Sequence, residues 1–232
     1  MKLAISGTYS TGKTTTTLAL SYLTGIPKTH ASTMREILPS AYPGKRLEVC
    51  MPHELMELGI RRFFERCDAE CQYNNHFISD GCAFQEWIYG TTRFKYGLNP
   101  NENMFKVAVS KIVNKTSYEV FQKSMEVFGE VAKQYVRNNY DIIVHLPVEF
   151  PFTPDGHRPV KEKFRTESEK LLLRTYNQWD IKPLVVTGSL KNRLQQITGV
   201  LNLPHQMSLE RAIDLAYSDK GKIFDSVQLE SR

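Results

Sequence analysis

A glycine-rich segment near the start of the chain, Gly7 to Thr14, has the residue types that bind nucleotide phosphates. Its sequence, GTYSTGKT, fits the pattern GxxxxGK[ST] at every fixed position. Glycines let the backbone turn sharply and bring N–H groups to the phosphates, and the start of a helix favours anions. Lys13 would neutralise the β- and γ-phosphate oxygens, and the Thr14 hydroxyl would bind Mg²⁺. The segment predicts a nucleoside triphosphate site made of Gly7, Ser10, Thr11, Gly12, Lys13, Thr14 and Thr15.

Asp80 is the second residue whose position suggests chemistry, because it ends a short apolar run over residues 76–79 that reads as a strand. The carboxyl ends of parallel strands meet at one edge of a sheet, so we expect Asp80 beside the phosphates. There it would hold Mg²⁺ or accept the proton of an attacking hydroxyl. The alternative is a helix N-cap, since a helical pattern follows. Asp141 is a weaker candidate for this role, because it begins its strand and would lie at the opposite end of the sheet.

A third candidate segment, 151–165, lies between an expected strand and an expected helix and is rich in proline and basic residues. Transfer of a phosphoryl group spreads negative charge over its oxygens, and arginines from a closing lid stabilise that charge. We therefore expect Arg158 and Arg165 to act as catalytic lid residues. The alternative is a solvated basic loop.

Aromatic residues follow Asp80 directly, and Phe84, Trp87 and Tyr89 have the right type to stack on the ring of a phosphate acceptor. The alternative for each is packing in the core beneath the following helix. The pair Arg61–Arg62 lies on an expected amphipathic helix, where a solvated face is favoured over a phosphate clamp.

Strands and helices alternate along the chain. We expect strands at residues 3–6, 76–79, 141–146 and 183–188, and helices at 13–23, 52–72, 84–96, within 104–136, at 166–179 and at 189–197. This alternation predicts an α/β domain with a mostly parallel, doubly wound sheet and helices on both faces, the fold of P-loop NTPases. We expect the domain to span residues 1–203, and 204–232 to form a C-terminal helical appendage.

The composition is that of an ordinary globular protein, with 41% hydrophobic and 24% charged residues. A net charge of +5 suits a small anionic ligand and does not favour nucleic acid as a partner. We expect no membrane span, because no apolar run approaches the roughly 20 residues that one needs. The four cysteines have no paired CxxC spacing, which favours free thiols and a cytoplasmic location. The alternative is a two-thiol metal site at Cys67 and Cys71, one helical turn apart. Whether the chain forms a homodimer is left open.

With these motifs, residues 1 to 198 resemble the P-loop kinases of the NadR-like ribosylnicotinamide kinase group, AAA-domain proteins described as ATPases or kinases of NAD metabolism. The chain is more distantly similar to thymidylate and deoxynucleoside kinases. The resemblance rests on the loop from Gly7, the strand ending in Asp80, and the Asp155-Gly156-x-Arg158 element with Arg165 after it. It implies a central parallel sheet, ATP with Mg²⁺, and phosphorylation of a ribosyl or similar hydroxyl. It also implies that Lys13 and Thr14 hold phosphate and metal, that Asp80 is the catalytic carboxylate, and that Arg158 and Arg165 are lid arginines.

Two departures from that family fall where an acceptor would sit. Relatives commonly have Glu-x-x-Arg after the second strand, and here Ser32-Thr33-Met34-Arg35 keeps Arg35, a substrate-binding candidate, without the acid. Relatives also commonly have arginine after the strand-ending aspartate, and here Gly81 follows Asp80. The leading hypothesis is an ATP-dependent kinase for a small-molecule hydroxyl acceptor. The alternative is a P-loop ATPase or nucleotide-dependent switch that acts with a protein partner.

Overall fold

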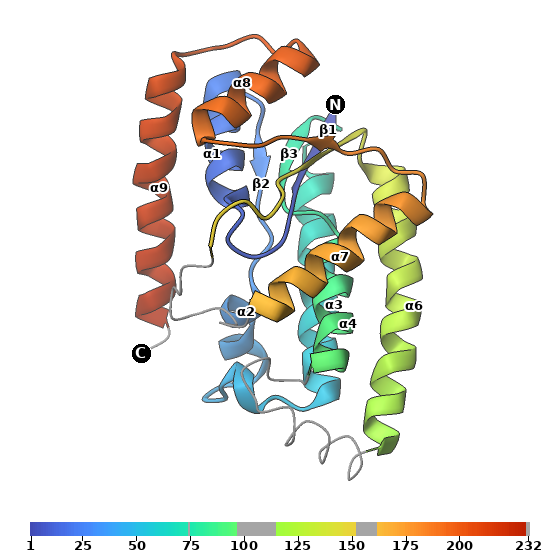
Figure 1. The fold of residues 1–232 in the computed structure, drawn as a ribbon. Helices are drawn as coiled ribbons and strands as arrows, with labels where there is room; N and C mark the ends of the chain where they lie inside the picture. Colours follow the sequence, from blue (N-terminus) through green and yellow to red (C-terminus); the bar gives the residue numbers. More distant parts are fainter. Residues whose placement is uncertain (74, 97–114, 152–161, 231–232) are drawn as a thin grey trace.

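The structure is a computed structural model, and it describes the chain apart from residues 74, 97–114, 152–161 and 231–232 (Figure 1). Its described part contains a five-stranded sheet with strand order β2-β3-β1-β4-β5, in which all the paired strands are parallel. The strands are β1 (Lys2–Ser6), β2 (Lys28–Thr29), β3 (Phe77–Asp80), β4 (Ile142–His145) and β5 (Leu184–Val185). The expected parallel α/β fold of P-loop NTPases is confirmed.

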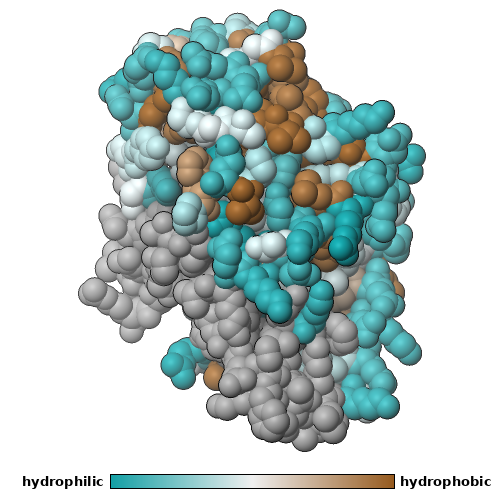
Figure 2. All heavy atoms as spheres, in the orientation of Figure 1, coloured by the Kyte–Doolittle hydropathy of each residue, from teal (hydrophilic) through white to brown (hydrophobic). Residues whose placement is uncertain are grey.

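Helices cover both faces of this sheet (Figure 1). They are α1 (Lys13–Thr24), α2 (Met34–Ala41), α3 (Pro52–Cys71), α4 (Phe84–Tyr96), α6 (Lys115–Asn139), α7 (Glu162–Gln178), α8 (Leu190–Leu201) and α9 (Leu209–Glu230), with a short 3₁₀ turn at Leu47–Val49. No helix in the described ranges is long and apolar enough to cross a membrane. Figure 2 shows that hydrophilic residues dominate the described surface on the face of Figure 1, with hydrophobic residues in small patches between them.

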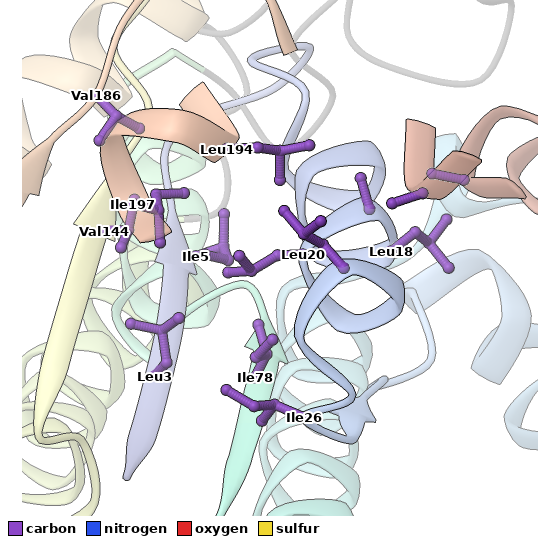
Figure 3. Close-up of a cluster of buried hydrophobic side chains, with 14 of the residues drawn as sticks. Leu3, Ile5, Leu18, Leu20, Ile26, Ile78, Val144, Val186, Leu194 and Ile197 are labelled. Atoms are coloured by element: carbon purple, nitrogen blue, oxygen red, sulfur yellow. The ribbon is translucent and has the colours of Figure 1, made fainter. Parts of the chain in front are cut away.

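The two faces of β1 belong to two separate hydrophobic cores, because neighbouring side chains of a strand point to opposite sides. Leu3 and Ile5 pack with α1 and α8 in the first core, which Figure 3 shows. Ala4 faces the second core, beneath α4, α6 and α7. Because β1 is buried on both faces, the loop that follows it starts from a fixed position.

The last helix is part of the first core. Ala212 and Ala216 of α9 are fully buried there, and α9 packs along α1. The Tyr22 hydroxyl of α1 also donates a hydrogen bond to the Asp219 carboxylate of α9. The segment after residue 203, which the sequence sets apart as an appendage, is therefore packed into the domain.

The residue-level expectations agree with most elements, and α4 has the expected bounds. The short β2 strand and α2 were missed. β2 has only two residues, too few to show a period. In α2, Met34, Ile37, Leu38 and Ala41 recur at helical spacing and pack into one cluster, but Pro39 within the segment argues against a helix in the sequence. The expected helix within 104–136 appears as α6 from Lys115, and its earlier part lies outside the described residues.

Candidate active site

The loop between β1 and α1 has the backbone shape that its glycines predict. Gly7 has φ +145° and Gly12 has φ +89°, and α1 begins immediately after Gly12. A Cβ atom added at Gly7 would lie 2.6 Å from the Leu146 carbonyl oxygen. Only glycine allows this close approach, which brings the loop against the end of β4.

Contacts within the loop and from outside it hold this shape. The Lys13 Nζ atom donates to the Thr8 carbonyl oxygen at 2.5 Å, and the Thr11 hydroxyl donates to the same oxygen at 3.1 Å. The Gln85 amide of α4 donates to the Gly7 carbonyl oxygen. Arg193 of α8 donates from Nη1 to the Thr11 carbonyl oxygen at 2.5 Å. Sequence reasoning missed Gln85 and Arg193, which lie far from the motif in the chain.

A cavity of about 450 Å³ opens over the loop. One side of the cavity is formed by the phosphate loop and the start of α1. A second wall is formed by residues at the ends of β2 and β3 and by residues of α3 and α4. Residues after β4 and one residue of α9 complete the lining. The lining includes Ser10, Gly12, Lys13, Thr14 and Thr15 from the first side, and Tyr9, His30, Thr33, Arg62, Asp80, Tyr89 and Lys220 from the other segments.

Asp80 lies in this wall because β3 ends beside β1, where Asp80 is paired with Ile5. Its side chain is 11% exposed, and its Oδ2 atom lies 4.0 Å from Nδ1 of His30. Thr14 and Asp80 thus present a hydroxyl and a carboxylate to one cavity. Oxygen donors of this kind are the ligands that Mg²⁺ takes in nucleotide sites, so these residues fit the expected metal.

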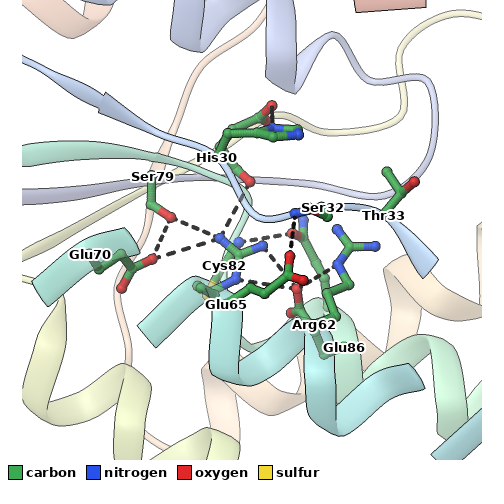
Figure 4. A network of polar contacts seen from close by, with 12 residues as sticks. His30, Ser32, Thr33, Arg62, Glu65, Glu70, Ser79, Cys82 and Glu86 are labelled. Atoms are coloured by element: carbon green, nitrogen blue, oxygen red, sulfur yellow. Dashed lines mark hydrogen bonds and ion pairs between the residues drawn. The ribbon is translucent and has the colours of Figure 1, made fainter. Parts of the chain in front are cut away.

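A buried polar network lies behind the end of β3 (Figure 4). Arg66 of α3 donates to the Ser79 hydroxyl at 2.8 Å and the Asp80 carbonyl oxygen at 3.3 Å, and its Nη2 lies 2.9 Å from Glu86. Burial alone would lower the pKa of Arg66, but the carboxylates of Glu86 and Glu70 outweigh burial and raise it well above its usual value. Arg66 therefore stays charged and fixes the strand end that carries Asp80.

Glu70 is the second acid of this network. It accepts hydrogen bonds from the hydroxyls of Ser79, Tyr135 and Tyr140. Burial and then the nearby Glu70 charge raise the pKa of Tyr140 well above its usual value, so this phenol stays protonated. Burial also raises the pKa of the Cys82 thiol to about 12, which makes Cys82 an unreactive core residue.

Two of the three aromatic candidates lie in the core alone, and Tyr89 lies where the second core meets the cavity. Phe84 is fully buried in the second core, with its ring centroid 5.9 Å from that of Tyr176. Trp87 packs beside Gly129 and under the Lys133 ammonium group, 5.0 Å from its ring centroid. Of the three, only Tyr89 is among the residues that line the described cavity. For Phe84 and Trp87 the structure therefore favours the core alternative.

Tyr89 is stacked on Tyr9 of the phosphate loop, with ring centroids 4.2 Å apart and ring planes 12° apart. Both rings line the cavity. This pair is an aromatic surface beside the expected phosphate position, and the sequence named only one member of it.

The expected arginines are not all brought to the cavity. Arg165 lies in the first turn of α7 with its side chain 2% exposed, and its Nη2 donates to the Phe150 carbonyl oxygen at 2.8 Å. It therefore fixes the chain after β4, next to the cavity wall. Arg35 is half-buried at the start of α2, where Thr33 rather than Arg35 is a lining residue. Arg158 lies outside the described residues.

Comparison with known proteins agrees with this geometry. The fold is similar to that of a solved structure described as deoxyadenosine kinase from M. mycoides with the products dCMP and a flexible dCDP bound. The TM-score is 0.55, and the sequence identity is 16%, over 87% of this chain and 99% of that chain. At this identity the likeness shows the fold. No curated protein matches the sequence. A family model described as an AAA domain, AAA_28, matches residues 2–193. The match covers most of the chain, including the phosphate loop and the strands of the sheet up to β5, so the chain belongs to this AAA-domain family of P-loop proteins.

Proposed function

We propose that the protein is an ATP-dependent small-molecule kinase that transfers the γ-phosphate of Mg-ATP to a hydroxyl of a nucleoside-like or related metabolite. One observation carries the proposal: a single cavity joins the phosphate loop to a second wall that contains Asp80, Arg62 and an aromatic pair. An ATPase also uses a carboxylate and an arginine beside the phosphates, so the aromatic pair is the part of this wall that favours an acceptor. The similarity of the fold to a protein described as a deoxyadenosine kinase supports the same class of acceptor.

On the donor side, backbone N–H groups at the start of α1 bind the phosphates, and Lys13 neutralises their charge. Lys13 would exchange its bond with the Thr8 carbonyl for phosphate oxygens. Thr14 and Asp80 would hold Mg²⁺, which neutralises charge that develops between the β- and γ-phosphates.

On the acceptor side, Asp80 orients the hydroxyl or accepts its proton, and both roles are compatible with its place in the wall. The ring of Tyr89, supported by Tyr9, provides a surface for a planar ring of the acceptor. Arg158 as a lid arginine is a prediction from the sequence, and so are the cytoplasmic location and any homodimer.

The test is ADP release from Mg-ATP against a panel of nucleosides, ribosides, nucleotides and amino-sugar alcohols, with product masses followed in parallel. Stimulation by one acceptor, whose mass rises by one phosphate, would establish the kinase and name its substrate class. Slow hydrolysis that no acceptor changes would contradict the kinase. It would instead favour an ATPase or nucleotide-dependent switch that acts with a protein partner.

A further inference from the structure

Two neighbouring arginines of α3 have different surroundings. Arg61 has a side chain that is 49% exposed, and it pairs with Glu57 one helical turn away at 2.7 Å. Arg62 has a side chain that is 20% exposed and lines the cavity together with Thr33 and Asp80. The solvated face expected for this pair therefore applies to Arg61 and not to Arg62.

Arg62 is held in place by a buried acid. Its Nε atom donates at 3.1 Å to Oε1 of Glu86, whose side chain is fully buried. The same oxygen accepts from Nη2 of Arg66 at 2.9 Å, so Glu86 is itself fixed (Figure 4). A side chain held at Nε has lost much of its freedom before any ligand arrives, which lowers the entropic cost of binding.

This tether leaves the outer edge of the Arg62 guanidinium available. Among the residues that the structure describes, no hydrogen bond or ion pair engages its Nη1 or Nη2 atoms. A planar pair of N–H donors fits two oxygens of a carboxylate or phosphate at once, and such charge-assisted pairs are stronger than neutral hydrogen bonds. A fixed guanidinium edge in a cavity is thus suited to an oxyanion.

We propose that Arg62 binds an oxyanion group of the acceptor, a phosphate or a carboxylate that the acceptor carries in addition to the hydroxyl to be phosphorylated. The inference rests on the proposed kinase function, because it concerns the acceptor half of the same cavity. Asp80 lies in the same wall and repels an anion. The oxyanion at Arg62 therefore turns the hydroxyl end of the acceptor toward Asp80.

The test measures oxyanion binding by titration calorimetry while the donor site is filled. ADP, Mg²⁺ and beryllium fluoride occupy the phosphate loop and the γ-phosphate position, so that an added oxyanion reports the acceptor half. Inorganic phosphate and acetate are the two probes, and the probe that binds more tightly shows whether the group is a phosphate or a carboxylate. The proteins are the wild type, Arg62→Gln, Arg62→Lys and the matched control Arg61→Gln.

We expect Arg62→Gln to weaken binding of the preferred probe at least tenfold, and Arg61→Gln to stay within twofold of the wild type. Arg62→Lys keeps the charge and the Glu86 ion pair but loses the planar donor pair. Its affinity should therefore fall severalfold, and this variant reports on the site even if Arg62→Gln does not fold.

Two results would overturn the inference, and the experiment distinguishes them. Equal oxyanion affinity in the wild type and the Arg62 variants, with the donor complex formed, overturns the role of Arg62 alone. Failure of the wild type to bind ADP with beryllium fluoride overturns the proposed kinase, and the inference with it.

Discussion

Arg193 of α8 donates a hydrogen bond to the Thr11 carbonyl oxygen at 2.5 Å, although the two residues are 182 positions apart in the sequence. Its other terminal nitrogen lies 2.7 Å from Glu149, which in turn accepts from the Gly188 backbone N–H at 2.8 Å. The phosphate loop is therefore fastened to the chain after β4 and to the turn before α8. Its shape depends on residues outside the motif.

Replacement of Arg193 tests this dependence. Arg193→Ala removes the donor to the Thr11 carbonyl oxygen and the cation beside Glu149, which keeps only its bond from the Gly188 N–H among the contacts described above. We therefore expect a loss of about 2–4 kcal/mol in the free energy of unfolding. We also expect affinity for Mg-ATP to fall roughly tenfold, because the loop must be ordered on binding. Urea unfolding and nucleotide titration measure the two effects. Arg174→Ala, at an exposed position of α7, is the control, and a variant of Arg193 with unchanged affinity would contradict the role.

Lys13 is the second test, since it is half-buried at the cavity and donates to the Thr8 carbonyl oxygen of the loop. Lys13→Ala should keep the fold and lower the rate of phosphoryl transfer at least 10²-fold, because one preorganised cation at the developing charge is lost. Steady-state ADP release measures the rate, and the melting temperature reports the fold. Lys182→Ala, whose side chain is 88% exposed, should match the wild type. A Lys13 variant with wild-type turnover would refute the phosphate-loop assignment.

Tyr89 and Phe84, five residues apart on α4, should differ in their effect on the acceptor. Tyr89→Ala removes the ring that lines the cavity, and we expect the acceptor KM to rise severalfold. Tyr89 is 8% exposed and packs in the second core, so this variant should also lose stability. Tyr89→Phe keeps the ring and should retain most of the affinity. Phe84→Ala empties a fully buried site and should cost about 3–5 kcal/mol of stability. Acceptor kinetics and denaturant unfolding separate the two, and a rise in KM limited to the Phe84 variant would reverse the assignment.

The different positions of Tyr89 and Phe84 show what the sequence alone could not predict. The motif from Gly7 to Thr14 and the strand-end position of Asp80 could be predicted, because each depends on local sequence and on one rule of sheet geometry. Which face of α4 meets the cavity depends on how the helix is rotated against the sheet. Gln85 and Tyr89 are one helical turn apart, and both face the phosphate loop. Their spacing indicates a shared face of α4, but it identifies the cavity side only when the position of one of them is already known.

The sequence favoured a solvated face over a phosphate clamp for Arg61–Arg62 and did not single out Arg193, for a related reason. On α3, Arg62, Arg66 and Glu70 recur at every fourth position, a spacing that places them on one face of the helix. This spacing could have separated Arg62 from Arg61, but Glu86, which fixes the position of Arg62, comes from another helix. No local pattern connects Arg193 to the phosphate loop, because that contact exists only after α8 has folded onto the domain.

The place of α9 leads to the last prediction. Ala212 is fully buried where α9 packs along α1, the helix that begins at the phosphate loop. Ala212→Leu would force extra volume into this contact, and we expect it to cost about 1–3 kcal/mol of stability. Since Lys220 of the same helix lines the cavity, the displaced helix should also weaken nucleotide binding. Urea unfolding and nucleotide titration measure both, with Tyr217→Ala at an exposed position of α9 as the control. Unchanged stability and affinity in Ala212→Leu would contradict a structural role of α9 in the domain and would favour the separate helical appendage expected from the sequence.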